Sequence, residues 1–234
     1  MSCGLTRYGR REWLLATVVA ALLLMWFGCL ALFISPWWAA VLVPVGIVWG
    51  WVLLFFRDPS RTPPEEDGAF LSPADGTVAD ITNIGPDSAL GTDGVKVGVF
   101  MSIFNVHVNR SPCDGRVRSV EHNDGTFLDV RKPEAAFRNE STTIHMTHVR
   151  GGREHTIVVR QIAGLIARRI ITDLAVGQEM GRGERIGMIK FGSRLELLVP
   201  RELVGEVRVA VGQPALAGRT VLVAAPKGTD RAEP

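Results

Sequence analysis

The chain has 234 residues, of which 47% are hydrophobic and 21% charged, and its formal net charge is +2. This content excludes a disordered chain, since disorder needs low hydrophobicity and high net charge. Three of the 26 basic and one of the 24 acidic residues lie in residues 1–56, which leaves 23 of each sign in residues 57–234. The larger part therefore lacks the basic excess typical of nucleic-acid binding.

Two long apolar runs stand at the beginning of the sequence. Trp13–Ile34 is an uncharged run of 22 residues, and Trp37–Phe56 adds 20 more. About 20 apolar residues suffice for a helix to cross the hydrocarbon layer. The first run is longer than the core of a secretory signal peptide, and no small-residue cleavage site precedes the second run. The sequence predicts a membrane hairpin with helices over about 13–34 and 37–56. A hairpin that enters only one leaflet would show the same pattern.

Basic residues flank the outer ends of both runs, whereas the short turn between them has none. Because cytoplasmic loops carry an excess of Lys and Arg, we expect both termini and the soluble part on the cytoplasmic face of the cell membrane. The three cysteines agree with that compartment, since an odd number without CxxC spacing predicts neither a disulfide framework nor a zinc site. The flanking residues are Arg7, Arg10, Arg11, Arg57 and Arg61.

The soluble part begins with a Pro-rich and charged linker over residues 57–68. Beyond it, short runs of strand-forming residues alternate with turn residues and predict one mostly β domain over 69–234, a compact sandwich or barrel. Residues 165–172 fit a short helix or a strand equally well. The expected strands are Gly76–Ile84, Val95–Ile103, Arg116–His122, Thr142–Val149, Thr156–Ile162, Arg185–Phe191, Leu195–Val199, Val204–Val211 and Thr220–Ala225.

Few residues point to chemistry by their spacing alone. His145 and His148 are three apart in a strand-like run, so they face opposite sides of a strand and do not converge on one metal ion. His107 is consistent with an ordinary histidine at the end of a strand, Asp75 with an Asp-Gly turn, and Ser193 with a bend. A Ser-His-Asp triad is recognised by geometry, so the order of these residues does not establish one.

Six ordered blocks resemble one enzyme family. From about residue 50 to residue 200 the chain is similar to the short, membrane-associated bacterial and archaeal phosphatidylserine decarboxylases, in which an amino-terminal hydrophobic hairpin is also typical. The blocks are Phe55-Phe-Arg-Asp-Pro59, Ser72-Pro-Ala-Asp-Gly76, Phe104-Asn-Val-His-Val-Asn-Arg110, Asn139-Glu140, Gln161-Ile-Ala-Gly-Leu-Ile-Ala-Arg-Arg-Ile170 and Gly187-Met-Ile-Lys-Phe-Gly-Ser-Arg194.

The resemblance implies a pyruvoyl cofactor made from the chain itself. Ser193 would attack the carbonyl of Gly192, and the resulting ester would be eliminated and hydrolysed to leave a pyruvoyl group at position 193. The resemblance gives His107 the role of the base, with Asp75 holding its tautomer. The mature protein would pair a large chain, residues 1–192, with a small chain, residues 193–234.

The same resemblance implies the substrate and the reaction. Phosphatidylserine in the membrane would form a Schiff base with the pyruvoyl group, lose CO₂ and leave as phosphatidylethanolamine, with the cofactor as electron sink. Arg168 and Arg169 would meet the lipid phosphate, or else form an exposed structural pair. Longer family members have a histidine where this chain has Phe104, so the acid that reprotonates the product is not assigned; His145 and His148 are alternatives.

Two other functions fit parts of the sequence. Residues 175–192 resemble half of a biotinyl or lipoyl domain, which would make the C-terminal part barrel-sandwich-like and the protein a carrier or adaptor. In those domains the modified lysine stands at an exposed hairpin tip, whereas Lys190 lies in an apolar run. An uncleaved serine hydrolase would use the same triad, but the Gly-x-Ser-x-Gly elbow is absent from the sequence.

Overall fold

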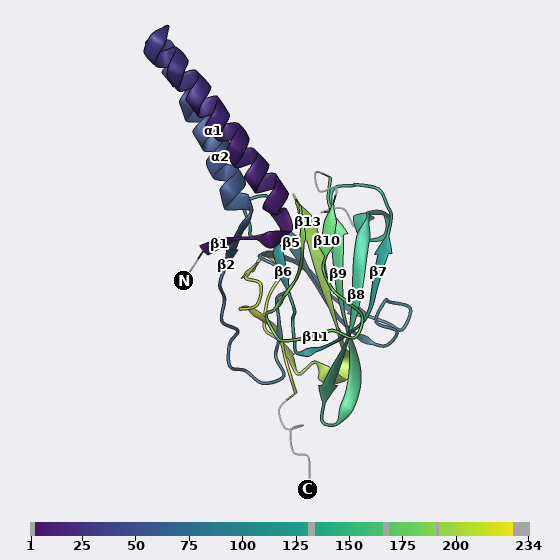
Figure 1. Ribbon diagram of the computed structural model, residues 1–234. Helices are drawn as coiled ribbons and strands as arrows, with labels where there is room; N and C mark the ends of the chain where they lie inside the picture. Colours follow the sequence, from purple (N-terminus) through teal and green to yellow (C-terminus); the bar gives the residue numbers. More distant parts are fainter. Residues whose placement is uncertain (1–2, 131–133, 166–168, 191, 227–234) are drawn as a thin grey trace. The chain divides into compact units, whose positions relative to one another are not determined.

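The chain divides into two units, Met1–Ser60 and Arg61–Pro234. The computed structural model (Figure 1) describes residues 3–130, 134–165, 169–190 and 192–226. In the first unit, β1 (Cys3–Leu5) is followed by a 3-10 turn, η1 (Arg7–Gly9), and by helix α1 (Arg10–Phe33). A second 3-10 segment, η2 (Pro36–Val41), leads into helix α2 (Leu42–Phe55), and β2 (Arg57–Pro59) then returns to pair with β1.

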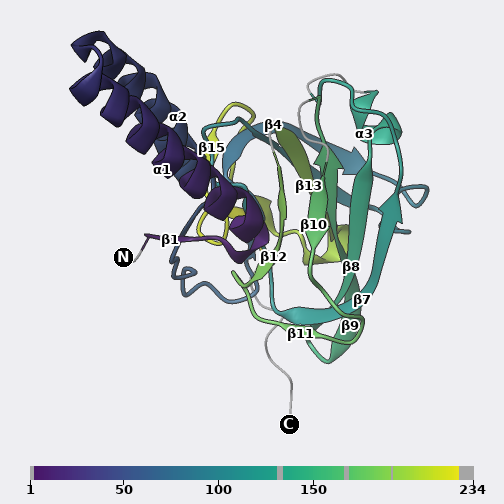
Figure 2. The same ribbon diagram turned by 45° about the horizontal axis from the view of Figure 1, so that its top comes forward.

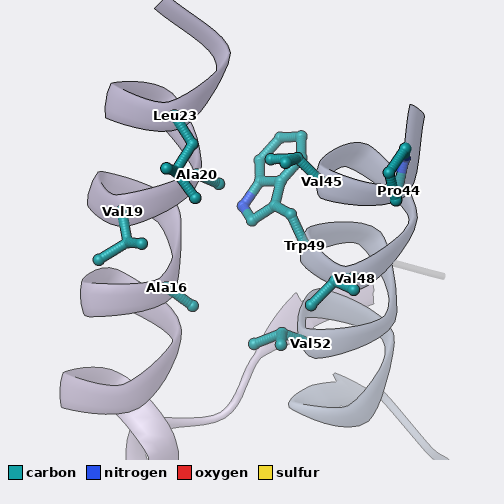
Figure 3. A pocket seen from close by; sticks show the side chains of 9 residues that line it. All are labelled: Ala16, Val19, Ala20, Leu23, Pro44, Val45, Val48, Trp49 and Val52. Carbon is teal, nitrogen blue, oxygen red and sulfur yellow. The ribbon is translucent and has the colours of Figure 1, made fainter. Parts of the chain in front are cut away.

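The helices of the first unit confirm the predicted hairpin. Arg7–Phe33 and Pro36–Phe55 are each long and apolar enough to cross a membrane. Within the helix pair, Trp49 Nε1 donates a hydrogen bond to Thr17 Oγ1 at 3.2 Å, and the Thr17 hydroxyl donates to the Trp13 carbonyl at 2.7 Å. Inside a bilayer, polar groups must find hydrogen-bond partners within the protein, so these bonds suit a hairpin that is surrounded by lipid. An apolar groove lies between the helices and is lined by small and branched residues, among them Ala16, Ala20 and Val45 (Figure 3).

The second unit is built on one curled, eight-stranded antiparallel sheet (Figures 1 and 2). Three of its seven pairings join strands that follow one another in the chain, and the other four join segments that lie far apart in the sequence. In pairing order the strands are β11 (Glu179–Met180), β7 (Gly115–Asn123), β8 (Ser141–Arg150), β9 (Arg153–Ala163), β13 (Ser193–Pro200), β5 (Gly94–Met101), β4 (Gly76–Ile84) and β15 (Pro214–Ala215).

Two three-stranded sheets complete this unit. The first is formed by β10 (Ile170–Thr172), β12 (Arg185–Ile189) and β6 (Val108–Arg110), and the second by β14 (Glu206–Val207), β16 (Val221–Ala224) and β3 (Phe70–Leu71). The helical pieces are short: α3 (Ala135–Arg138) and the 3-10 turn η3 (Arg201–Leu203). The mostly β prediction is confirmed.

Each of the nine expected strands overlaps an observed strand. The undecided segment 165–172 ends in β10, and its residues 166–168 lie outside the described residues, as does Phe191 at the end of the expected strand 185–191. The expected linker differs in one respect, because its first three residues form β2. Two- and three-residue strands such as β3, β6 and β15 were not expected, since they are too short to show a period.

Strand alternation decides which face of the main sheet meets the core. In β13, Leu195, Leu197 and Val199 are fully buried in the hydrophobic core, whereas Arg194 and Glu196 point to the other face. Side chains along a strand alternate with period two. Ser193, two residues before Leu195, therefore faces the core, and it does so at the very end of the strand.

Candidate active site

Ser193 is the first residue of β13 and lies between two neighbouring strands. Its partners in register are Met101 of β5 on one side and Ala163 of β9 on the other. The side chain is fully buried, and its hydroxyl lies 3.3 Å from the sulfur of Met101. A thioether is a weak acceptor, so this contact holds the serine oxygen only loosely. Among the described residues, the Ser193 hydroxyl is thus shielded from solvent and only weakly held.

The peptide before Ser193 has a backbone that favours glycine. Gly192 has φ +61°, in the left-handed region that other residues rarely adopt. Its carbonyl group is packed against Gly164: a Cβ atom added to Gly164 would stand only 2.1 Å from the Gly192 oxygen and 3.0 Å from its carbon. The carbonyl between Gly192 and Ser193 therefore occupies space that only a glycine at position 164 leaves open.

A buried asparagine fixes the segment that contains Gly164. Asn139 donates from Nδ2 to the carbonyls of Ala163 and Leu128, both at 2.8 Å, and its Oδ1 accepts from the Leu128 amide at 2.8 Å. The Ala163 amide in turn donates to the Glu140 carbonyl at 2.9 Å. The Asn139-Glu140 pair thus ties the loop before β8 to the end of β9, one residue before Gly164.

His107 immediately precedes β6 and is fully buried. Its Nδ1 lies 2.9 Å from the carbonyl oxygen of Asn105. A carbonyl only accepts hydrogen bonds, so the Nδ1 atom bears the proton and the lone pair of the neutral ring is on Nε2. Because β6 pairs with β12, the strand that leads to Gly192, the histidine and the peptide before Ser193 belong to adjoining segments.

Asp75 stands directly before β4, and its carboxylate is held by an arginine. Arg61 donates from both terminal nitrogens, Nη1 to Oδ1 and Nη2 to Oδ2, the latter at 2.6 Å. The Ala217 amide also donates to Oδ1, at 2.8 Å. The side chains of Arg61 and Asp75 are 8% and 6% exposed, so this is a buried, bidentate ion pair. A carboxylate offers about four acceptor sites, and these contacts use three of them.

The structure pairs the Asp75 carboxylate with an arginine, whereas the sequence-based expectation was a histidine. That expectation gave the carboxylate to His107, whereas Nδ1 of the histidine is held by Asn105 and the carboxylate by Arg61. Arg61 was not expected in the site because it belongs to the linker-like segment, where nothing in the local pattern distinguishes it from a solvated charge.

A chain of buried polar side chains supports the site from the core side. Thr172 Oγ1 donates to Gln161 Oε1 at 2.8 Å, Gln161 Nε2 donates to Asn109 Oδ1 at 2.8 Å, and Asn109 Nδ2 lies 3.7 Å from the Met101 sulfur. The sulfur of Met101 therefore contacts both Asn109, at the end of this series of hydrogen bonds, and Ser193. Buried polar groups must be paired, and here the pairing fixes β6 and His107 relative to the main sheet.

Charged residues hold β13 from the opposite face of the sheet. Arg194 lies 2.5 Å from Asp80 Oδ2 and 2.9 Å from Glu196 Oε1, and Lys96 lies 3.5 Å from the same Glu196 oxygen. Two cations and two anions balance, which suits the deep burial of Glu196. These ion pairs thereby anchor the part of β13 that directly follows Ser193.

Comparison with known proteins places this arrangement in a family. The family model for phosphatidylserine decarboxylase matches residues 49–223, a span that includes Asp75, His107, Gly192 and Ser193. The chain belongs to the phosphatidylserine decarboxylase family.

Individual relatives agree over most of their length. The phosphatidylserine decarboxylase proenzyme of Pelobacter propionicus is 44% identical over 170 residues, covering 73% of this chain and 74% of the relative. The proenzyme of Nitrosomonas europaea is 41% identical over 191 residues, covering 81% and 84%. That of Zymomonas mobilis is 38% identical over 221 residues, covering 92% and 84%. These phosphatidylserine decarboxylases are named as proenzymes, that is, as precursors that are processed.

The remaining candidate residues of this phosphatidylserine decarboxylase family member are dispersed. Arg168 lies outside the described residues, and Arg169 is exposed. His145 contacts Ser119 and the Ala89 carbonyl, at 3.0 and 3.1 Å. His148 instead contacts the Asp114 carbonyl at 2.7 Å, and burial lowers the pKa of its ring.

Lys190 does not occupy the position that a carrier domain would need. It lies directly after β12 and is buried, whereas a biotinyl or lipoyl lysine stands at an exposed tip. The likeness of residues 175–192 to those domains is therefore one of strand pattern.

Proposed function

We propose that this chain is a precursor that cleaves itself between Gly192 and Ser193 and then decarboxylates phosphatidylserine to phosphatidylethanolamine. The observation that supports this most is the peptide at Gly192, which combines a left-handed glycine, a carbonyl packed on Gly164 and a buried, weakly held serine hydroxyl. Membership in a family whose relatives are named proenzymes supports the same conclusion.

The self-cleavage uses groups of this chain and one water molecule. His107 takes the proton of the Ser193 hydroxyl through the Nε2 lone pair, and the serine oxygen attacks the Gly192 carbonyl carbon. The C–O bond forms, the C–N bond breaks, and the proton passes from His107 to the amine nitrogen of Ser193, which converts the peptide into an ester. Loss of the Ser193 α-proton then expels the Gly192 carboxylate, and water releases ammonia from residue 193, which leaves a pyruvoyl group.

The site fits such a group because position 193 is buried and its strand is paired on both sides, with β5 and with β9. The pyruvoyl carbonyl supplies an electron sink for decarboxylation of an amino acid headgroup. Asp75 remains in the proposal as a positioning residue, because its Arg61-bound carboxylate fixes the turn before β4.

The two product chains would stay joined after cleavage. β13 pairs with β5 and β9, β15 pairs with β4, and β16 pairs with β3. Each of these pairs joins residues 193–234 to residues 1–192. The small chain thus contributes a central strand of the main sheet, and we propose a heterodimer as the mature form.

Replacement of Ser193 by Ala tests the proposal, because it removes the attacking oxygen. We expect Ser193→Ala to give one intact, inactive chain by mass spectrometry, whereas the wild type gives a 42-residue fragment with a blocked amino terminus. Ser141→Ala is the matched control, since Ser141 is also a buried serine at this end of the sheet. An intact wild-type chain that reacts with a fluorophosphonate would contradict the proposal and favour a serine hydrolase.

A further inference from the structure

Three large hydrophobic side chains are exposed on segments beside the candidate active site. Phe104 is 64% exposed, Phe137 is 83% exposed and Leu165 is 63% exposed. Single exposed apolar residues are ordinary, but a group of them beside a functional site indicates a binding surface. We call Phe104, Phe137 and Leu165 the apolar rim.

The members of the apolar rim come from three segments that meet at the start of β13. Phe104 follows Met101, the register partner of Ser193, by three residues. Leu165 directly follows Gly164, against which the Gly192 carbonyl packs. Phe137 lies in α3, two residues before Asn139, which holds the Ala163 carbonyl. Consecutive Cα atoms are about 3.8 Å apart, so each rim residue is tethered within a few residues of the site.

The opposite end of the same sheet provides an internal comparison. The register places Ser141 opposite Ile162 at the site end, and Arg150 opposite Arg153 at the far end. In Figure 1 the β8–β9 hairpin lies at this far end of the sheet. Val149 lies in β8 next to the turn of that hairpin, is 61% exposed, and so resembles a rim residue in apolar character and exposure.

We propose that the apolar rim enters the surface layer of a lipid bilayer and so docks the site directly on the membrane that holds the substrate. The occupant is lipid because the same chain has two helices long and apolar enough to cross a membrane, which keeps a bilayer within reach. The free energy falls when phenylalanine and leucine side chains move from water to the boundary between headgroups and acyl chains. The inference rests on the proposed function for the identity of the lipid substrate.

Single-cysteine labelling of the full-length protein in vesicles tests this docking. In a Cys3→Ser, Cys29→Ser background, cysteine replaces Phe104, Phe137, Leu165 or, as the control, Val149, and each protein is labelled with an environment-sensitive fluorophore. Cys113 can stay, because it is buried and its thiol has a raised pKa, which leaves it unreactive. The vesicles contain phosphatidylcholine with or without phosphatidylserine, plus nitroxide lipid as a quencher.

We expect the three rim labels to shift to shorter emission wavelengths and to be quenched in both vesicle types, while the Val149 label stays in water. Rim labels that behave like the Val149 label would overturn the inference. Insertion only into vesicles with phosphatidylserine would also overturn it, in favour of recognition of the headgroup. In parallel, CO₂ release is measured with the wild-type protein in the vesicles that contain phosphatidylserine. Its absence would contradict the proposed function and leave the label result readable.

Discussion

Two glycines that are far apart in the sequence, Gly164 and Gly192, approach each other closely at the site. A methyl group on Gly164 would overlap the Gly192 oxygen, so Gly164→Ala must displace the carbonyl that Ser193 attacks. A misplacement of about 1 Å can slow a reaction by about 10²-fold. We expect Gly164→Ala to fold but to cleave about 10²-fold more slowly, followed as the appearance of the small chain over time.

Two other glycines separate this effect from a general defect. Gly115→Ala also meets a backbone oxygen, that of Thr147 at 2.6 Å, but on β7. Gly85→Ala meets nothing closer than 3.9 Å. Both should cleave at the wild-type rate once folded, as judged by their melting temperatures. If Gly115→Ala slows cleavage as much as Gly164→Ala does, the effect belongs to strain in the sheet and not to the Gly192 carbonyl.

His107 and Asp75 are expected to affect the rate of cleavage and not its occurrence. General-base catalysis contributes about 10²–10⁴-fold, so His107→Ala should slow the appearance of the small chain by about that factor. Asp75→Asn should also slow it, because an amide cannot hold Arg61 as a charged pair and the turn before β4 loosens. A cleavage time course beside wild type and Ser193→Ala measures both. Wild-type rates in both variants would remove them from the proposed mechanism.

The individual residues show where inference from sequence stops. Motif resemblance brought forward Ser193, His107 and Asp75, and the structure places each at the start of a strand or directly before it. The roles of Arg61, Asn139 and Gly164 follow only from tertiary contacts. Locally, an arginine in a linker, an asparagine in a loop and a glycine at a strand end are ordinary. Asn139 and Gly164 do lie in the quoted blocks, which marked the segments without explaining them.

At the scale of strands, runs of strand-forming residues between turn residues were sufficient to predict the six longer strands of the main sheet. Runs such as Val95–Ile103 and Leu195–Val199 are rich in branched apolar residues, and they form the largely buried strands β5 and β13. Strands of two or three residues, such as β3 and β6, are held by their partners and contain no such pattern. The pairing of β13 with β5 and β9 also joins distant segments, and the residue pattern along one strand does not specify which strand it pairs with.

Strand β8 contains a buried histidine that should make stability depend on pH. Burial lowers the pKa of His148 below its ordinary value of 6.5, so at mildly acidic pH the unfolded chain binds more protons than the folded one. Stability from this group is complete above pH 6.5 and is lost as the pH falls from there toward the lowered pKa. We expect the melting temperature of the full-length protein in detergent to fall between pH 7 and pH 5, and less so in His148→Gln. Equal slopes in the two proteins would show that another group is responsible.

At the scale of the whole chain, charge and hydrophobicity are divided between different parts. Residues 57–234 have no net charge, so electrostatic attraction to anionic lipid is weak for this part. The helices α1 and α2 expose apolar side chains over most of their surface, which only a bilayer or detergent covers favourably. Membrane association should therefore depend on the hydrophobic effect, and the apolar rim adds to an attachment that the hairpin already provides.

The last prediction concerns how the hairpin attaches the chain and which side the enzyme unit faces. Membranes washed with high salt should retain the full-length protein, whereas detergent should release it, because salt screens charges and leaves apolar burial intact. Arginines at both outer ends of the hairpin favour the cytoplasmic side for both termini. Protease added to inverted vesicles should therefore digest the unit Arg61–Pro234, and protease outside intact spheroplasts should not. Release by salt would exclude the hairpin as the anchor. Digestion from outside the spheroplasts would instead leave the anchor in place and reverse the orientation, which would put the site on the opposite leaflet from the one we propose.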